Sequence, residues 1–289
     1  MRRRYLVLAA ILLLLAGGAA VVQRVLFPDA PKTMEVLSVR GEVTIVDPVS
    51  GGNAILQAGT KLKPGETVKT GHEGEAILQG RGNATITLAE HSAVRLDDVS
   101  KDGVSKFALT EGRVRSVVPE GSGGGVEITG GNDKASVVTR GGDIAVGIDG
   151  KGDLSIATFR GKASLTAGGE TRDLGVNELA VVSKGKVQIG AIPTSVLLKV
   201  AWPEAGKTRD PKTNLQVVAP PGATVRVNDT AVTLDSSGHA TVAVKLVEGE
   251  NKIHLEAQDV VGNKRNEDSQ TIVLDTRPPD IHGGKARWK

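Results

Sequence analysis

Hydrophobic and polar residues alternate where the chain leaves its N-terminal segment. Leu37, Val39, Gly41, Val43 and Ile45 have one parity, and the polar residues between them have the other. Strict alternation is typical of a β-strand with one face in a core and the other in water. The pattern therefore predicts that the odd-numbered residues from 37 to 45 face a core.

Short apolar runs of this kind recur between turns rich in glycine and proline. The predicted strands include Ala84–Leu88, Val94–Leu96, Phe107–Leu109, Val126–Ile128, Val137–Val138, Ile144–Ile148, Leu154–Ile156, Ala163–Leu165 and Leu179–Val182. Pro119–Gly125 (PEGSGGG) predicts a flexible loop between two of them. Because no amphipathic helix of ten or more residues is evident, we expect an all-β fold.

The amino-acid composition limits which residues can form the core. Glycine occurs 37 times, and aromatic residues make up only 2% of the chain. The core must therefore be built from Val, Ile, Leu and Ala, which suit the pleated surface of a sheet. We expect the rare aromatic residues Phe107 and Phe159 to lie in the core, and Trp202 to pack at the edge of a second domain.

A weak repeat accompanies the strands. Arg40–Val43, Glu111–Val114 and Arg160–Ala163 each place a glycine between charged residues ahead of a strand. The unequal spacing of the three segments argues against a regular solenoid array.

The stretch Ala54–Leu88 has the most specific order of turns and strands. It follows the pattern Gly59-x-x-Leu62-x-x-Gly65-Glu66-x-Val68-x-Thr70-Gly71, and Gly74 then precedes an apolar strand. We expect its glycines to lie in turns. The expected core residues are Leu62, Val68, Ile77, Ile86 and Leu88, and the expected exposed residues are Lys61, Lys63, Glu66, Lys69 and His72.

This pattern resembles the FecR family of envelope proteins, and the resemblance covers about Glu35–Ile189. It implies a β-rich domain over residues 35–190, either a roll or an irregular solenoid. Family members sit in the inner membrane and pass a signal to a sigma factor through a cytoplasmic domain. Here Met1–Tyr5 precede the apolar segment, and we expect these five residues to be too short for the anti-sigma role.

The N-terminal segment predicts export. Arg2, Arg3 and Arg4 precede the apolar run Leu6–Val22, and apolar residues resume up to Phe27. Residues 6–27 are long enough for a transmembrane anchor, with residues 1–5 in the cytoplasm. A cleaved signal sequence is the alternative, because small residues at 17–20 provide cleavage-type pairs. Residues 28–34 are a linker in either case.

A second unit is expected over residues 200–276, after a linker at 191–199. Alternating strands are broken there by turns at short intervals, such as Pro221–Gly222, Glu248–Gly249 and Asp259–Asn263. This spacing is typical of a β-sandwich, and the order of motifs resembles bacterial immunoglobulin-like repeats. Residues 277–289 form a basic tail.

The chain lacks a recognisable set of reactive residues. It has no cysteine, which excludes disulfides, thiol catalysis and Cys-type zinc sites. Its histidines show no i,i+4 or His-x-His spacing; they are His72, His91, His239, His254 and His282. No Gly-x-Ser-x-Gly sequence is present. We therefore expect a protein that is not an enzyme, with no catalytic, cofactor-binding or metal-binding residues, no cofactor and binding residues still unknown.

Three segments resemble ligand loops. Ala201–Thr208 fits a relaxed phosphate loop, but Pro203 and Pro211 argue against the helix that such a loop requires. Asp149–Asp153 resembles a calcium loop, and the preferred interpretation is a hairpin turn. Asp259 with Gly262–Asn263 is interpreted as a turn closed by Asx hydrogen bonds, with a Ca²⁺ contact as the alternative. The missing helix argues against a nucleotide as a partner. The mixed charges and net charge of +3 show no basic block, so nucleic acid is not expected either.

These observations favour a non-catalytic, membrane-tethered scaffold or protein-binding module in the periplasm. Its expected partners are an envelope protein or the cell wall, besides the inner membrane. It would be a single-pass inner-membrane protein, or a periplasmic one if the N-terminal segment is cleaved. One alternative is an envelope-sensing regulatory protein related to FecR-type signalling. The other is an accessory binding subunit of a cell-wall or polysaccharide enzyme.

Overall fold

The computed structural model describes residues 33–277 apart from 195, 197, 221–222 and 236–237, and within them the predicted all-β class is confirmed. The one helical segment among these residues is the short 3₁₀ turn η1 (Arg81–Asn83). The described residues form no helix with the length and apolar character needed to cross a bilayer. The predicted anchor at residues 6–27 lies outside the described residues, as does the tail beyond Arg277.

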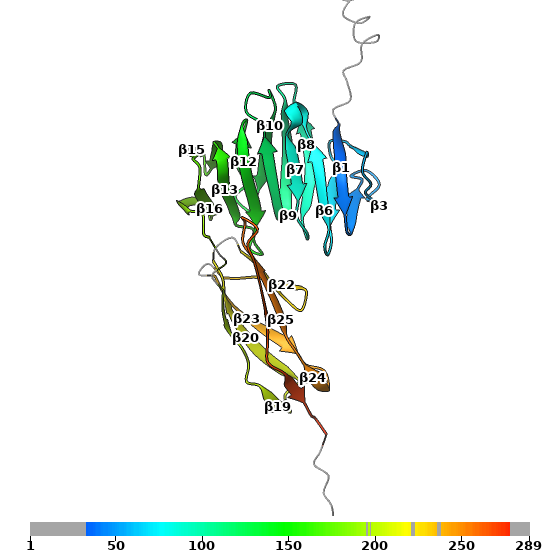
Figure 1. The fold of residues 1–289 in the computed structure, drawn as a ribbon, viewed down its shortest axis with the longest axis vertical. Coiled ribbons are helices and arrows are strands. Elements are labelled where there is room, and N and C mark those ends of the chain that lie inside the picture. Colours follow the sequence, from blue (N-terminus) through cyan, green and yellow to red (C-terminus); the bar gives the residue numbers. More distant parts are fainter. Residues whose placement is uncertain (1–32, 195, 197, 221–222, 236–237, 278–289) are drawn as a thin grey trace, which may run out of the picture. The chain divides into compact units, whose positions relative to one another are not determined.

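Strands β1–β17 form the first region, which consists of two sheets joined by one shared strand, β9 (Figure 1). All neighbours in the first sheet are antiparallel, and its spatial order is β4 (Lys61–Leu62), β1 (Met34–Arg40), β6 (Glu75–Gln79), β7 (Thr85–Leu88), β9 (Val104–Val118), β12 (Gly142–Ile148), β13 (Leu154–Gly161), β16 (Glu178–Ser183) and β17 (Lys186–Ala191). The order in the second sheet is β3 (Asn53–Ile55), β2 (Val43–Val46), β5 (Thr67–Thr70), β8 (Ala93–Val99), β9, β10 (Gly125–Gly130), β11 (Ala135–Thr139), β14 (Ala163–Ala167) and β15 (Glu170–Leu174). In this second sheet β9 and β10 are parallel.

The glycines of the weak repeat mark the points where the chain passes from one sheet to the other. Residues 104–111 of β9 pair with β8 and β10, and residues 112–118 pair with β7 and β12. Gly112 lies at this crossing with φ of +78°, and a Cβ atom there would lie 2.3 Å from the carbonyl oxygen of His91. Gly41 separates β1 from β2, and Gly161 ends β13 before β14. The repeat is therefore a repeated bend between layers.

The parity predicted for the first strand fails at Leu37 but holds at Val39, Val43 and Ile45: Val43 is buried, and Val39 and Ile45 pack against the core partly buried. Met34 and Val36 are buried in the core, whereas Leu37 is 42% exposed. A β-bulge between Val36 and Ser38, in the pairing of β1 with β6, moves the following residues to the other face. A turn at Gly41–Glu42 then separates two strands where one continuous alternation had been expected.

The other core predictions for this region hold in most places. Leu62, Val68, Ile86 and Leu88 are buried as predicted, but Ile77 is only half-buried because its neighbours Ala76 and Leu78 face the core. Phe107 is buried between the sheets. Phe159 is not part of that core, because it lies on the outer face of β13.

Strands β18–β27 form the second region. They make three small sheets: β18 (Lys199–Ala201), β20 (Lys212–Val218) and β23 (His239–Lys245); β19 (Gly206–Thr208), β27 (Ile272–Leu274) and β24 (Gly249–Asn251); and β22 (Thr230–Val232), β21 (Thr224–Val227), β25 (His254–Gln258) and β26 (Lys264–Asp268). Their apolar residues surround one core that includes Leu215, Val225 and Leu255, with Trp202 packed against it. Val196 and Leu198 belong to this same core.

Candidate functional site: the junction of the two β regions

A turn of the second region covers the outer face of β12 and β13. The turn connects β25 to β26, and its Val260 packs against Ala145 and Ala157. β12 is consequently buried along its whole length. A Cβ atom at Gly147 would lie 3.1 Å from Val260 Cγ2. Small side chains on the outer face of β12 thus allow the second region to approach the sheet.

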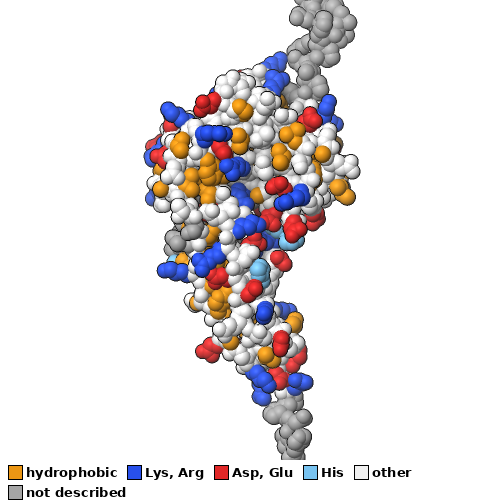
Figure 2. Space-filling model, in the orientation of Figure 1, with side chains coloured by type: hydrophobic (Ala, Val, Ile, Leu, Met, Phe, Trp, Pro, Cys, Tyr) orange, Lys and Arg blue, Asp and Glu red, His pale blue; other side chains and the backbone are white. Residues whose placement is uncertain are grey.

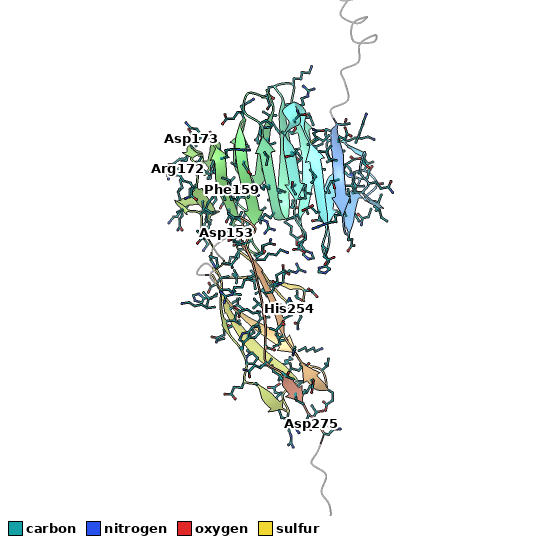
Figure 3. All side chains as sticks on the ribbon, viewed as in Figure 1. Asp153, Phe159, Arg172, Asp173, His254 and Asp275 are labelled. Atoms are coloured by element: carbon teal, nitrogen blue, oxygen red, sulfur yellow. The ribbon has the colours of Figure 1, made fainter. Side chains whose placement is uncertain are left out.

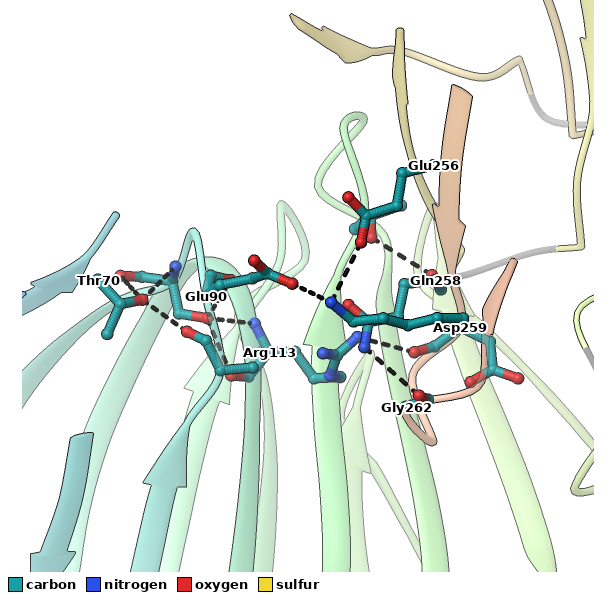
Figure 4. A network of polar contacts seen from close by, with 11 residues as sticks. Thr70, Glu90, Arg113, Glu256, Gln258, Asp259 and Gly262 are labelled. Carbon is teal, nitrogen blue, oxygen red and sulfur yellow. Dashed lines mark hydrogen bonds and ion pairs between the residues drawn. The ribbon is translucent and has the colours of Figure 1, made fainter. Parts of the chain in front are cut away.

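The backbone of this turn is also bound by a half-buried arginine of β9. Arg113 Nη1 donates a hydrogen bond to the carbonyl oxygen of Asp259 at 2.9 Å (Figure 4). The Asp259 carboxylate accepts from the backbone N–H and from Nδ2 of Asn263, both at 2.8 Å, which confirms the predicted Asx turn. Burial lowers the pKa of the Arg113 guanidinium, although the carboxylates of Asp259, Glu90 and Glu256 oppose that effect.

A second polar contact joins the regions through Lys264, at the start of β26. Its ammonium group binds Glu90 Oε1 in the first region and Glu256 Oε1 in the second, the latter at 3.1 Å. Burial would raise the pKa of Glu90, but the hydrogen bond and charge of Lys264 outweigh it and the pKa is lowered. The pKa of Lys264 is raised despite burial, because both carboxylates stabilise its charged form.

Buried Thr70 holds two turns of the first region together beside these contacts. Thr70 Oγ1 donates to the carbonyl oxygen of Ala89 at 2.5 Å and accepts from the backbone N–H of Ser92 at 2.8 Å. The backbone N–H of His91 donates to the carbonyl oxygen of Gly71 at 3.3 Å. The turn after β5 and the turn after β7 therefore lie side by side.

The paired turns bring together His72, Glu90 and His91. Their ligand atoms all lie within 4.8 Å of one another, and the two imidazole centroids are 6.2 Å apart. Burial lowers the pKa of His91, and the nearby charge of Arg226 adds to this effect. Sequence spacing could not reveal the cluster, because His72 lies in the turn between β5 and β6 and His91 in the turn between β7 and β8.

A small cavity adjoins the cluster. It has a volume of about 100 Å³, and His91 lines it together with the charged residues Glu90, Glu111, Arg113, Asp149, Arg226 and Glu256. Arg226 Nε is buried and, within the described part of the chain, has no hydrogen-bond partner. On the face drawn in Figure 2, acidic, basic and histidine side chains gather where the two regions meet.

The remaining sequence candidates lie elsewhere. In the segment Ala201–Thr208, a short loop runs into strand β19 and not into a helix. Asp149 Oδ1 accepts from the N–H groups of Lys151 and Asp153 at 2.9 and 3.0 Å, so the predicted hairpin turn is confirmed. Figure 3 shows Asp153 at the end of the first region and His254 on the second. His254 pairs with Asp268, His239 lies near Asp235, and His282 is outside the described residues.

Comparisons with known proteins assign no family. No protein-family model matches the chain, and no curated protein matches it. A crystal structure from Parabacteroides distasonis, named as a candidate anti-sigma factor, is 14% identical with a TM-score of 0.37; the match covers 43% of this chain and 59% of that one, which is less than two thirds of its length. A tetra-tandem repeat in the extending region of a large adhesion protein is 18% identical with a TM-score of 0.23, over 86% of this chain and 68% of that one. A polysaccharide lyase is 10% identical with a TM-score of 0.22, over 90% and 42%. These TM-scores are too low to transfer a function.

Proposed function

We propose that this protein is a non-catalytic binding protein of the bacterial envelope, in which two β regions act as one scaffold. The observation that carries this proposal is the clamp between the regions, formed by Arg113 on the Asp259 carbonyl and by Lys264 between Glu90 and Glu256. Val260 adds apolar contact on the same turn. A joint that combines apolar burial with charged hydrogen bonds restricts relative motion, because several contacts must break together.

The charged groups of the clamp are engaged with each other. Arg113 binds a backbone carbonyl, and Lys264 is shared by two carboxylates. Groups committed in this way hold structure in place and are poorly disposed to transfer protons, which supports a non-catalytic role. The arginine-led apolar segment of the sequence supports the envelope location.

The partner in this proposal is an extended protein segment that adds to edge strand β17. Among the described strands, β17 pairs with β16 alone. Its Ile189 is 42% exposed, and Val176, at the start of the adjoining turn, is 59% exposed. An exposed edge offers backbone donors and acceptors to a partner strand, and neighbouring apolar side chains supply contact area.

Site-specific photocrosslinking in envelope preparations tests the proposal. A photoreactive residue replaces Gln188 on the exposed edge β17, and a matched control replaces Lys69, an exposed residue on interior strand β5. We expect a discrete crosslinked protein from position 188 and none from position 69. Recovery of free monomer only, or a hydrolytic activity that depends on a single Ser or Asp, would overturn the proposal.

The turn pattern of residues 59–71 favours a second candidate, an envelope-sensing regulatory protein. Gly59 and Gly65 have φ of +81° and +94°, so the turns that underlie the FecR resemblance are present. The same crosslinking experiment separates the two candidates. A signalling protein of the inner membrane as the captured partner supports the regulatory role, whereas a structural envelope protein supports the scaffold.

A further inference from the structure

We propose that His72, Glu90 and His91 form a binding site for a divalent transition-metal ion, with Zn²⁺ as the best-suited ion. Two imidazoles and one carboxylate are a ligand set that zinc accepts, with a fourth position for water or another donor. The ligand atoms lie within 4.8 Å of one another. Small side-chain rotations therefore suffice to bring all three to one ion. This inference is independent of the proposed scaffold function.

The backbone beneath the cluster is held in an uncommon conformation. Glu73 and His91, one in each turn, have φ of +52° and +53°, a region that residues other than glycine rarely occupy. The Thr70 hydrogen bonds keep the two turns in place. Backbone strain of this kind is often found at binding sites, where the surrounding structure maintains it.

The carboxylate ligand is already oriented. Lys264 binds Oε1 of Glu90, and the backbone N–H of Glu73 also donates to this carboxylate. Such outer contacts fix the direction of a ligand before the metal binds. Coordination through the other carboxylate oxygen would keep the contact with Lys264.

The surrounding charges predict moderate affinity. The carboxylates of Glu90, Glu111, Asp149 and Glu256 favour a cation, whereas Lys264, Arg113 and Arg226 oppose one. Arg226 acts directly on His91 through its charge. Replacing it with a neutral residue should therefore tighten binding, and this response distinguishes the proposed site from zinc binding to an exposed histidine elsewhere.

The cavity gives the ion an accessible position. Glu90 and His91 both line it, so a metal held between them would reach its open volume. Water or a donor atom from a partner would complete the coordination there.

Isothermal titration of the untagged full chain with ZnCl₂, after treatment with a chelator, tests the inference. We expect one site per chain, lost or weakened about 10-fold or more in His72→Ala, in His91→Ala and in Glu90→Gln. His254→Ala is the matched control, since this exposed histidine also pairs with a carboxylate but lies on β25. It should bind zinc as the wild type does, and Arg226→Gln should bind more tightly.

Cobalt substitution provides a second test of the metal site. Substitution of Co²⁺ should give ligand-field absorption that disappears in His72→Ala, a variant of an exposed side chain that is expected to fold normally. Absence of zinc binding in the wild type, or equal binding by wild type, His72→Ala and His91→Ala, would overturn the inference. Equal loss in the His254→Ala control would overturn it as well.

Discussion

The two β regions build stable cores in different ways. In the first, 17 strands form sheets that continue into each other through β9, and most strands have partners on both sides. In the second, the sheets have three or four strands each, so edges make up a larger share of the structure. A continuous sheet restricts each strand through two neighbours, whereas small sheets depend more on the shared core. The difference shows that similar aliphatic composition supports both a layered and a more open β architecture.

The largest expected effect is the truncation of Phe107 in the first region. Phe107 is the largest fully buried side chain of the described residues and lies between the two sheets. Phe107→Ala should lower the free energy of unfolding by about 3–5 kcal/mol, through lost burial and the cavity left behind. Chemical denaturation of the full chain measures the loss. A change under 1 kcal/mol would show that the layers repack more freely than a continuous sheet allows.

The corresponding core truncation in the second region is Leu255→Ala. Leu255 is fully buried on β25, within the core of the small sheets. Leu255→Ala should cost about 2–5 kcal/mol, and the smaller core should make the second region unfold first. Hydrogen exchange resolved by peptide would locate the loss in strands β18–β27. If protection falls equally in β1–β17, the regions unfold as one unit and the comparison fails.

Gly112 tests the crossing between layers. Gly112→Ala should destabilise the first region by more than the ~1 kcal/mol of a simple positive-φ penalty, because the new Cβ meets the His91 carbonyl at 2.3 Å. Gly185→Ala is the matched control, since its φ is +71° and nothing lies within 4 Å of the added Cβ. Thermal unfolding of the two variants gives the difference. Equal shifts in melting temperature would mean that the backbone clash relaxes without cost.

The clamp connects the two regions, and Arg113→Met tests this connection by removing one of its contacts. The loss of the charged hydrogen bond to Asp259 should cost about 1–3 kcal/mol and should separate the unfolding of the two regions. Arg95→Met, which removes an exposed ion pair with Asp97, should change stability by less than about 1 kcal/mol. Calorimetry shows whether one transition becomes two. If the calorimetric scans of Arg113→Met and Arg95→Met superimpose, Arg113 does not help to hold the two regions together.

The smallest effect is expected at Ser116, in the interior of β9. Its hydroxyl is buried and, among the described residues, has no hydrogen-bond partner. Ser116→Ala should be neutral or stabilising by about 1 kcal/mol, because an unpaired buried hydroxyl is removed with little change in volume. Denaturant titration checks the sign. A clear loss of stability would indicate that the hydroxyl has a partner in solution, such as a bound water.

The local structure of this protein can be predicted from its sequence. The alternation of Ile144, Val146 and Ile148 predicts a strand, and the Asp149 and Asp259 segments predict turns that the structure contains. These features follow from backbone preferences and from hydrogen bonds between residues close in the chain. They can therefore be predicted without knowledge of the residues that pack against them.

Contacts between residues far apart in the chain depend on the tertiary fold. The bulge in β1 arises from its pairing with β6, and it places Leu37 at the surface against the predicted parity. Phe159 lies on the outer face of β13 and packs there against a cluster that includes Val260 of the second region. His72 and His91 meet because Thr70 joins two turns whose proximity depends on strand order. Strand register and the contact between regions result from many weak long-range interactions acting together, and no short sequence pattern encodes them.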